Sequence, residues 1–400
     1  MLNLALNKPA LQSSTSIWSL GSHPEEDARG ANNGQISRLY AFHTAYEANP
    51  WWQVDLLNEF VIRKVVLYNR QEYAERLRYF SILKSLDGEK WVVIFRKRDK
   101  SIFGNANDLP YVSEISGNHL ARYIRIRLDG VESLHFSECQ VFGEPVGVDT
   151  RRGLVDDAAQ AEEERCKLPP GRDGKLVTLD DFTVFVDYGN YAPEIIATLE
   201  SGSYEGRERW LAKEILEPGD RVIEAGTAVG LVAMTASLIV GAANVLTFDA
   251  NPDIVADAQN NFKRNGLEEI KSHWGVLKNR QTTLGKSDTV DFYIAKDFWA
   301  SRLHASEQDA NIVKKVKAPV FCLEDEIEAH RANVLISDIE GGEVDLFMRS
   351  DLRGITKIII ETHYGFVGER ETDEMIRKFI LDGFSIHLGL SGQHVTTLRR

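Results

Sequence analysis

The chain has 400 residues, 43% of them hydrophobic and 27% charged, so it is long enough for two or three domains with buried cores and too apolar to be disordered. The net charge of −13 comes entirely from residues beyond 145, which disfavours nucleic acid as a partner, and no apolar run approaches the roughly 20 residues of a membrane-spanning helix. The three cysteines are far apart and the N-terminus has no secretory signal pattern, so we expect free thiols and a cytoplasmic protein.

Short segments of alternating apolar and polar residues dominate the first 145 residues. We expect strands at WWQVDL (51–56), VIRKVVLYNR (61–70), YFSILKS (79–85), WVVIFRK (91–97), ARYIRIRL (121–128) and HFSECQVFG (135–143). Turn residues such as LDGEK separate these segments, and few stretches suit a helix. The pattern predicts an all-β antiparallel sandwich, with Trp51 and Trp52 in its core.

The wording and order of these segments resemble discoidin-like domains, and in particular F-type (fucose-binding) lectins, over about residues 3–145. The resemblance is carried by NLALNKPALQSST, ANNGQ, FHT, NPWWQVDL, YNR, AERL and LHFSECQVFG. It implies a jelly-roll fold in which His43, Arg70 and Arg76 bind the hydroxyl groups of a carbohydrate. Because the chain lacks the adjacent cysteine pair of these lectins, the resemblance predicts glycan binding without predicting fucose.

The same resemblance implies a structural calcium ion, bound by oxygen atoms of the loop ANNGQ and of the acid near residue 138. The candidate ligands are Asn33, Ser37, Ser137 and Glu138, through carbonyl groups and one carboxylate. The alternative is that hydrogen bonds alone close this loop.

The pattern changes after residue 145. The acidic segment LVDDAAQAEEERC (154–166) predicts a linker with a short helix over 146–175. Beyond it, short apolar strands alternate with helices, which predicts an α/β domain over 176–400 with a mostly parallel sheet covered on both faces. We expect, in order, a hairpin (175–188), a helix (203–216), a strand (221–226), a helix (231–240), a strand (244–250), a helix (252–266), a strand (333–340), a helix (343–352), a strand (357–363) and a helix (371–384).

The segment VIEAGTAVG (222–230) predicts a strand, a glycine turn and a helix. Gly226 permits a tight turn, and Gly230 lets the next helix pack closely. The following strand ends in FDANP, so Asp249 lies at the same sheet edge. There its carboxylate can accept hydrogen bonds from both ribose hydroxyls of a nucleoside. A turn of this kind alone is often an ordinary connection. The spaced acid, and Ala228 in place of a middle glycine, favour a methyltransferase over a dinucleotide enzyme.

Four motifs in order resemble the FkbM family of methyltransferases over about residues 176–400: EAGTAVG (224–230), FDANP (248–252), SDIEGGE (337–343) and IIETH (359–363). The resemblance implies a Rossmann-like class I fold with S-adenosyl-L-methionine as the methyl donor. It implies cofactor contacts at Glu224, Ala225, Gly226, Gly230, Asp249, Asn251 and Val276.

Methyl transfer to a hydroxyl needs a group that takes up the proton of that hydroxyl. Asp338, at the end of a predicted strand, is the favoured base, and His363 at the end of the next strand is the second candidate. The alternatives are that Asp338 caps the following helix and that His363 is an ordinary polar residue at a strand end. Glu343 is expected to offset the dipole of that helix.

Asp338, Glu340 and Glu361 could instead hold a divalent metal, although we do not expect one in the catalytic site. Ser301 lies in a segment expected on the acceptor side of the pocket and is a candidate substrate contact. Both halves together predict an O-methyltransferase that acts on a sugar hydroxyl of a glycan, while the first half binds carbohydrate. One alternative is a glycan-recognition protein with a degenerate methyltransferase fold. Another is a methyltransferase for a non-sugar acceptor, in which the sandwich forms the interface of a homo-oligomer.

Overall fold

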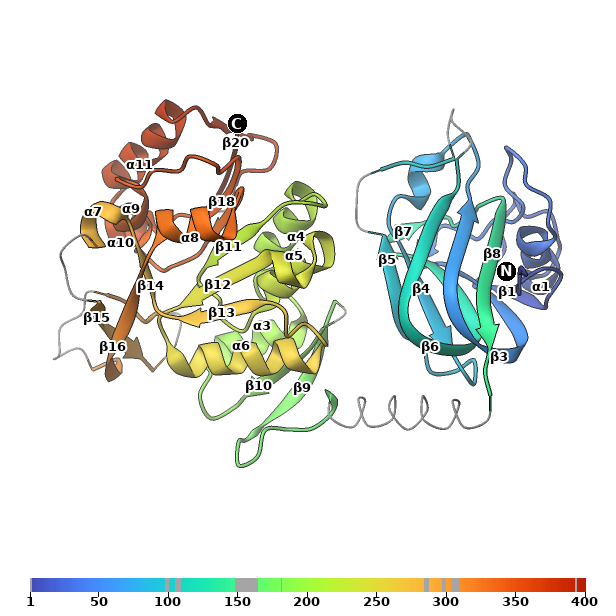
Figure 1. The fold of residues 1–400 in the computed structure, drawn as a ribbon, viewed down its shortest axis with the longest axis horizontal. Coiled ribbons are helices and arrows are strands. Elements are labelled where there is room, and N and C mark those ends of the chain that lie inside the picture. The colour runs from blue at the N-terminus through green and yellow to red at the C-terminus, as the bar shows by residue number, and fades with distance from the viewer. Residues whose placement is uncertain are drawn as a thin grey trace. The chain divides into compact units, whose positions relative to one another are not determined.

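In the computed structural model the chain divides into two compact units, Met1–Glu162 and Glu163–Arg400, drawn as ribbons in Figure 1. The structure describes residues 2–97, 101–104, 109–147, 165–180, 182–283, 288–296, 300–303, 310–392 and 394–400. The linker helix expected between the units falls largely outside these ranges. Across the described ranges, no helix combines the length and apolar character that crossing a bilayer requires.

The first unit is built from antiparallel strands, as the alternating pattern predicted. Its main sheet has the order β1-β3-β6-β4-β5, and β8 also pairs with β3. The strands are β1 (Ala10–Gln12), β2 (Glu47–Ala48), β3 (Trp51–Tyr68), β4 (Phe80–Ser85), β5 (Val92–Lys97), β6 (Tyr111–Leu128), β7 (Val131–Glu132) and β8 (Glu138–Pro145), where β2 pairs with β7. Short helical turns lie at α1 (Pro24–Ala28), η1 (Arg29–Asn32) and η2 (Ala74–Leu77).

Two strands that the sequence predicts separately are one continuous strand, β3. Its pairing with β6 shifts register between Asp55 and Phe60, and this shift lies where the apolar alternation is interrupted. The first part of β3 pairs with β1, and the second part pairs with β8. The interruption therefore marks an irregularity within a strand, and not a turn between two strands.

The core of the first unit packs around Trp52. This side chain is fully buried, and its indole Nε1 donates a hydrogen bond to the carbonyl of Ala28 (2.8 Å). The rings of Phe42 and Phe136 lie against it and against each other. The prediction that Trp51 is also a core residue is wrong, because Trp51 is only half-buried and its ring stacks on the guanidinium of Arg125 at 4.0 Å.

The second unit contains a mixed sheet in the order β13-β12-β11-β17-β18-β20-β19. Its strands are β11 (Val222–Ala225), β12 (Val245–Asp249), β13 (Lys271–Trp274), β17 (Val334–Ser337), β18 (Lys357–Glu361), β19 (Ser385–Ile386) and β20 (Val395–Arg399). The pairs from β13 to β18 are parallel, whereas β20 runs antiparallel to both of its neighbours. The sequence reading missed β19 and β20, so the sheet is less uniform than predicted.

Helices cover both faces of this sheet, as predicted. Alternate residues of β11 show this, because Val222 packs into one hydrophobic cluster and Ile223 into another. The first cluster includes side chains from α4 (Gly206–Ile215), α5 (Leu231–Val240) and α6 (Pro252–Arg264). The second includes side chains from α8 (Leu323–His330), α9 (Glu343–Phe347) and α11 (Glu369–Leu381).

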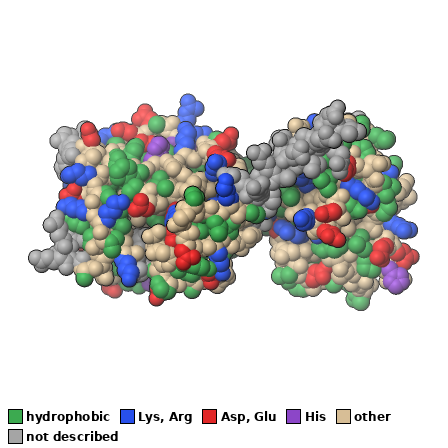
Figure 2. All heavy atoms as spheres, turned by 90° about the horizontal axis from the view of Figure 1, so that it is seen from below, with side chains coloured by type: hydrophobic (Ala, Val, Ile, Leu, Met, Phe, Trp, Pro, Cys, Tyr) green, Lys and Arg blue, Asp and Glu red, His purple; other side chains and the backbone are tan. Residues whose placement is uncertain are grey.

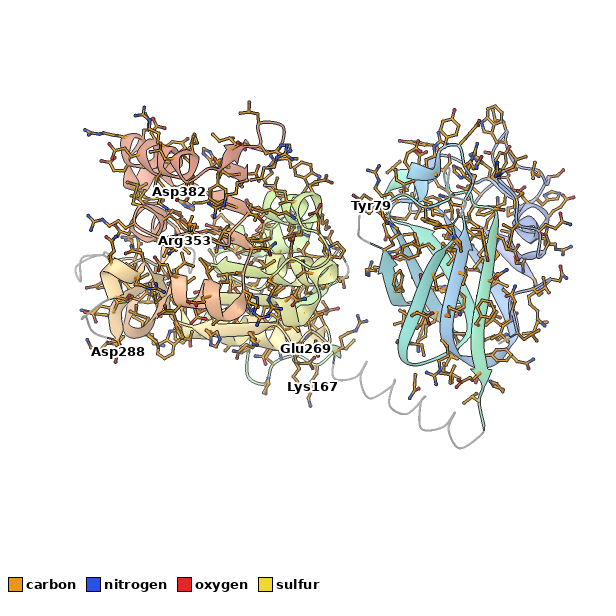
Figure 3. All side chains as sticks on the ribbon, turned by 45° about the horizontal axis from the view of Figure 1, so that its top comes forward. Tyr79, Lys167, Glu269, Asp288, Arg353 and Asp382 are labelled. Carbon is orange, nitrogen blue, oxygen red and sulfur yellow. The ribbon has the colours of Figure 1, made fainter. Side chains whose placement is uncertain are left out.

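Smaller elements surround the sheet. The predicted hairpin is β9 (Gly174–Leu179) with β10 (Phe182–Asp187), and α3 (Pro193–Ser201) follows it. A separate sheet joins β14 (Val276–Lys278), β16 (Ile312–Cys322) and β15 (Thr289–Ala295), and the remaining short elements are η3 (Ala242–Asn244), α7 (Arg280–Thr283) and α10 (Tyr364–Val367). Figure 3 draws the side chains, with Arg353 in the turn before β18 and Asp382 just after α11. Acidic and basic side chains are interspersed over the face of each unit seen in Figure 2.

Candidate functional site

A cavity of about 760 Å³ lies in the second unit, where the carboxyl ends of β11, β12 and β17 meet. Parallel strands bring their ends to one edge of the sheet, so loops that are far apart in the sequence line the same space. Of the predicted site residues, the lining includes Ala225, Gly226, Asp249, Asn251, Val276, Ser301 and Asp338. Glu224, Gly230 and His363 are not part of the described lining.

The turn after β11 requires glycine at residue 226. Gly226 has a φ of +95°, and a Cβ placed there would lie 1.8 Å from the carbonyl oxygen of Asp338. The loops after β11 and β17 are therefore in direct backbone contact, which the amide of Asp338 reinforces by donating to the carbonyl of Ala225 (2.9 Å). Gly230 allows close packing of α5 on α6, because a Cβ there would lie 2.5 Å from the ring of Phe262.

Asp249 ends β12 beside this turn. Its carboxylate accepts hydrogen bonds from the amides of Ala228 (3.1 Å) and Asn251 (2.9 Å), while the side chain of Asn251 caps α6. Burial raises the pKa of Asp249 to about 6, despite these hydrogen bonds. The carboxylate thus links the glycine turn to the next strand and also faces the cavity.

Glu224 is buried within the sheet, where burial raises its pKa to about 8. One of its carboxylate oxygens has no hydrogen-bond partner among the described residues. A buried carboxyl group of this kind is stable when it carries a proton. Its predicted contact with the cofactor stays a prediction, because the side chain does not line the cavity.

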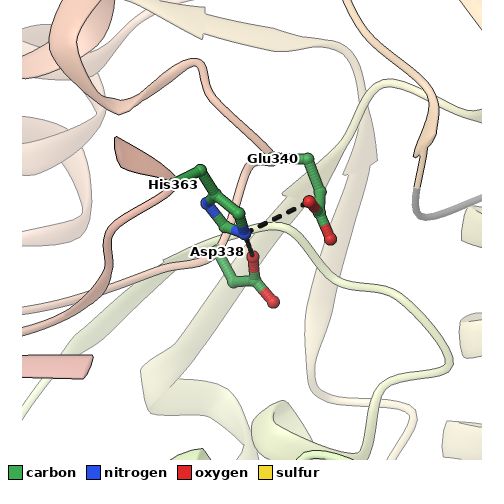
Figure 4. Close-up of side chains that lie close together, drawn as sticks. All are labelled: Asp338, Glu340 and His363. Carbon is green, nitrogen blue, oxygen red and sulfur yellow. Dashed lines mark ion pairs between the residues drawn. The ribbon is translucent and has the colours of Figure 1, made fainter. Parts of the chain in front are cut away.

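Three acids surround His363, and Figure 4 shows two of them, Asp338 and Glu340. Its Nδ1 lies 2.8 Å from Oε1 of Glu343, and its Nε2 lies 3.1 Å from Oε2 of Glu340 and 3.6 Å from Oδ1 of Asp338. Burial alone would lower the pKa of His363, but the hydrogen bonds to Glu340 and Glu343 outweigh it and raise this pKa to about 11. His363 is therefore a cation at neutral pH, which makes it a poor proton acceptor.

The structure changes the reading of two residues in this cluster. Glu343 is 1% exposed and holds the imidazole of His363, so it does more than offset the dipole of α9. Asp338 does not cap α9, because the N-cap of that helix is Gly342. Burial, together with Glu361 and Glu340, raises the pKa of Asp338 well above its ordinary value. The predicted role of Asp338 as a base stays a prediction, and the structure places the residue in the lining of the cavity.

The expected metal alternative involved Asp338, Glu340 and Glu361. The structure instead brings His363 to the first two acids, and ligand atoms of these three residues lie within 4.8 Å of one another. With His363 protonated on both nitrogens, a divalent cation would first have to displace the Nε2 proton. The ligand atoms of Asp338, Glu340 and His363 are close enough together to hold one cation.

The predicted sugar ligands of the first unit lie around two tyrosines. The guanidinium of Arg70 lies 4.9 Å from the ring of Tyr40 and 5.1 Å from that of Tyr73, and Arg76 lies 4.7 Å from Tyr73. His43 lies 5.5 Å from Tyr40 between ring centroids, with its Nδ1 2.7 Å from the carbonyl of Thr44. The three predicted residues and both tyrosines therefore share one site.

His135 belongs to the same site, although the sequence reading did not select it. It is 1% exposed, and its ring lies 5.3 Å from that of His43. Burial and the charge of Arg70 lower its pKa to about 3, so it is neutral. Neither ring nitrogen has a hydrogen-bond partner among the described residues. The only signal in the sequence was its place in LHFSECQVFG, a segment that also supplies the predicted calcium ligands.

The predicted calcium site contains a carboxylate, Glu138, with one oxygen that has no hydrogen-bond partner among the described residues. Glu138 is fully buried, its Oε1 accepts from the amide of Gly34 (3.1 Å), and its Oε2 has no hydrogen-bond partner among the described residues. Burial raises the pKa of Glu138 to about 7. Ser37 donates its amide to Oγ of Ser137 (2.8 Å), and Asn33 accepts from the amide of Gln35. Hydrogen bonds therefore close the loop only in part, and the donor set fits a hard cation.

Comparison with protein families assigns a different family to each unit. Residues 10–139 match the model of the F5/8 type C domain, and residues 224–386 match that of the Methyltransferase FkbM domain. Both resemblances drawn from the sequence motifs are thereby confirmed. Since each match covers less than half of the chain, each describes a part of it.

Curated relatives match short stretches. The chain is 45% identical over 60 residues to ribosomal protein L11 methyltransferase of Symbiobacterium thermophilum, which is 15% of this chain and 19% of that protein. It is 36% identical over 70 residues to Fucolectin-6 of Anguilla japonica, which is 17% of this chain and 38% of that protein. The chain thus spans less than two fifths of the length of either relative.

Similar solved structures include lectin modules. The lectin domain of Lectinolysin complexed with Lewis B antigen is 28% identical, with a TM-score of 0.29, and the match covers 36% of this chain and 99% of that one. The f-lectin (fucolectin) from striped bass serum is 24% identical, with a TM-score of 0.31, and the match covers 35% of this chain and 48% of that one.

Proposed function

We propose that this protein is an S-adenosylmethionine-dependent O-methyltransferase that acts on a sugar hydroxyl of a glycan, and that its first unit binds carbohydrate. One observation carries the proposal: a large cavity at the sheet edge brings the glycine turn, Asp249 and Asp338 together. The match of residues 224–386 to a methyltransferase family supports the reaction type. The match of residues 10–139, and the Fucolectin-6 relative, support carbohydrate binding by the first unit.

The cavity fits the methyl donor on structural grounds. The turn at Gly226 has no side chain, so the backbone can approach a ligand closely. Asp249 lines the cavity at the end of the neighbouring strand β12, where a carboxylate can accept hydrogen bonds from the hydroxyl groups of a ribose. When bound, the donor supplies an electrophilic methyl group on a sulfonium.

The residues of the chain then position the acceptor and move its proton. In its ionised form Asp338 takes up the proton of the acceptor hydroxyl, and its position in the cavity lining places it where an acceptor would bind. Glu343 fixes His363, whose positive charge lies 3.6 Å from Asp338 and offsets the negative charges of the cluster. Ser301 lines the cavity, although its hydroxyl already accepts from the amide of Ala295 (3.0 Å), so it shapes the wall.

We predict that Asp249→Ala weakens S-adenosylmethionine binding by about tenfold or more, because a hydrogen bond to a charged group contributes ~1.5–3 kcal/mol. Titration calorimetry of the full chain measures this. The matched control is Asp253→Ala, an exposed acid four residues along that pairs with Lys314. The assignment is wrong if Asp249→Ala folds normally, by circular dichroism, and binds the cofactor with unchanged affinity.

We predict that His43→Ala and Arg70→Ala each abolish carbohydrate binding while the first unit stays folded, because each removes a directed hydrogen-bond donor. Retention on a panel of immobilised sugars measures this, and residues 1–145 alone are expected to fold and to bind weakly. Arg63→Ala is the control, since Arg63 pairs with Glu144 elsewhere on the unit. If both variants retain every sugar that the unchanged protein binds, the unit has a structural role.

A further inference from the structure

An aromatic side chain at the cavity has no role in the proposal so far. α10 begins directly after His363, and its Phe366 is 68% exposed while it lines the cavity. The Phe366 and His363 rings lie 6.4 Å apart between centroids. A Cβ on Gly341 would lie 3.4 Å from Cβ of Phe366. Phe366 therefore lies against the loop between β17 and α9, which contains Asp338. An exposed phenylalanine on its own is ordinary, but this one faces a functional cavity.

Hydrogen-bond acceptors line the same part of the cavity. Asp338 and Glu340 both belong to the lining, and their carboxylates lie 3.6 Å and 3.1 Å from Nε2 of His363. The lining therefore includes both an apolar ring, Phe366, and the carboxylates of Asp338 and Glu340. A pyranose has both matching surfaces, since its C–H groups form an apolar face and its hydroxyls donate from the edge.

The charged side chains that line the cavity indicate whether a neutral or an acidic acceptor would bind there. The acidic side chains among the described lining residues are Glu205, Asp249, Asp338, Glu340, Asp345 and Glu371. The basic side chains of the described lining are Lys278 and Arg302. An acceptor with a carboxylate, sulfate or phosphate beside Glu340 and Asp338 would lie among acidic side chains that the single cation His363 offsets only in part, which costs binding energy.

We propose that Phe366 is the stacking platform of the acceptor subsite, and that the acceptor is an uncharged pyranose whose hydroxyls face Glu340 and Asp338. This inference rests on the proposed methyl transfer at the same cavity, and it adds the substrate's charge class and the residue that binds its apolar face. Phe366 contacts the ring of the sugar and takes no part in proton transfer. Its removal therefore affects acceptor affinity and spares both cofactor affinity and the chemical step.

The test uses the full chain and transfer of labelled methyl from S-adenosylmethionine to three probes: methyl α-L-fucopyranoside, methyl β-D-galactopyranoside and the methyl glycoside of glucuronic acid. Phe366→Ala is expected to raise the KM for a neutral glycoside about tenfold with little change in kcat, and Phe366→Trp is expected to restore it. The glucuronide is expected to be a poor substrate. Leu381→Ala, which shortens an exposed apolar side chain at the end of α11, is the control and leaves KM unchanged.

The outcomes separate the two proposals. If a neutral glycoside is methylated with the same KM by Phe366→Ala and the unchanged protein, the platform is refuted and the proposed function stands. Equal methylation of the glucuronide refutes the charge class alone. If calorimetry shows that the cofactor binds but no glycoside is methylated, both the sugar acceptor and the platform are refuted. If the cofactor does not bind, the proposed function itself fails.

Discussion

Replacement of Asp338 by asparagine is expected to lower turnover by a factor of about 10²–10⁴ with little change in cofactor affinity, because it removes general-base assistance. Asparagine keeps the shape of the side chain and cannot take up the proton. The backbone contact between Asp338 and the glycine turn is unaffected, so the cavity keeps its form. For the unchanged protein, turnover should rise with pH as Asp338 loses its proton, and the raised pKa places this rise above the ordinary carboxyl range.

The measurement is methyl transfer under saturating cofactor, together with calorimetric titration of the cofactor. Asp351→Asn is a suitable control, because that exposed acid pairs with Arg353 in the turn after α9. A fall in turnover of less than about tenfold would exclude Asp338 as the base, because general-base assistance contributes about 10²–10⁴-fold. His363 is then a weak replacement, since its pKa of about 11 keeps it protonated. Loss of activity on adding a chelator, with Asp338→Asn losing metal affinity, would instead identify a cation ligand.

Gly226→Ala is expected to abolish cofactor binding and to lower the melting temperature of the second unit by about 5–15 °C. A side chain at positive φ costs ~1–2 kcal/mol, and relieving a contact of 1.8 Å with the carbonyl of Asp338 costs about 1–3 kcal/mol more. The turn after β11 and the loop after β17 must separate, and both line the cavity.

Gly219 provides a matched control for this effect. It has a φ of +96°, and a Cβ added there meets no described atom within 4 Å. Gly219→Ala therefore adds the backbone strain without the contact, and the melting temperature of this variant should fall by only about 2–8 °C. Differential scanning calorimetry compares the two variants. Equal losses would mean that the Asp338 contact is not the reason for glycine at 226.

Local patterns predicted most of the second unit. The apolar stretch 231–240 and the helical pattern over 252–266 are local signals, and α5 and α6 form where these signals place them. The strands β19 and β20 were missed, because Ser385–Ile386 is too short to show a period and Val395–Arg399 takes its place only by pairing with β18. The strands β13, β14, β15 and β16 were not predicted either, and they likewise depend on distant partners.

In the candidate site, too, the sequence predicted what local motifs specify and missed what depends on contacts between distant residues. Motif order was enough to select Asp249 and Asp338 as candidates, because each lies at the end of a predicted strand inside the matched range 224–386. It could not show that Glu343 holds His363, since that contact joins the first residue of α9 to the residue before α10, across 20 residues, and helps to raise the pKa of His363. The sequence could not single out Phe366 or His135 either. Phe366 is notable because it lines the cavity, and His135 because neither of its ring nitrogens has a hydrogen-bond partner among the described residues.

The arrangement of β19 and β20 has a consequence for self-association. Because β20 lies between β18 and β19, the long hydrophobic strand β18 is interior, and the outer strand on that side has two residues. The outer strand on the other side is β13, which has four residues and is mostly exposed and polar. Sheets with short polar edges are poor templates for adding a strand from another molecule. Copies of this chain are therefore not expected to associate by joining their seven-stranded sheets edge to edge.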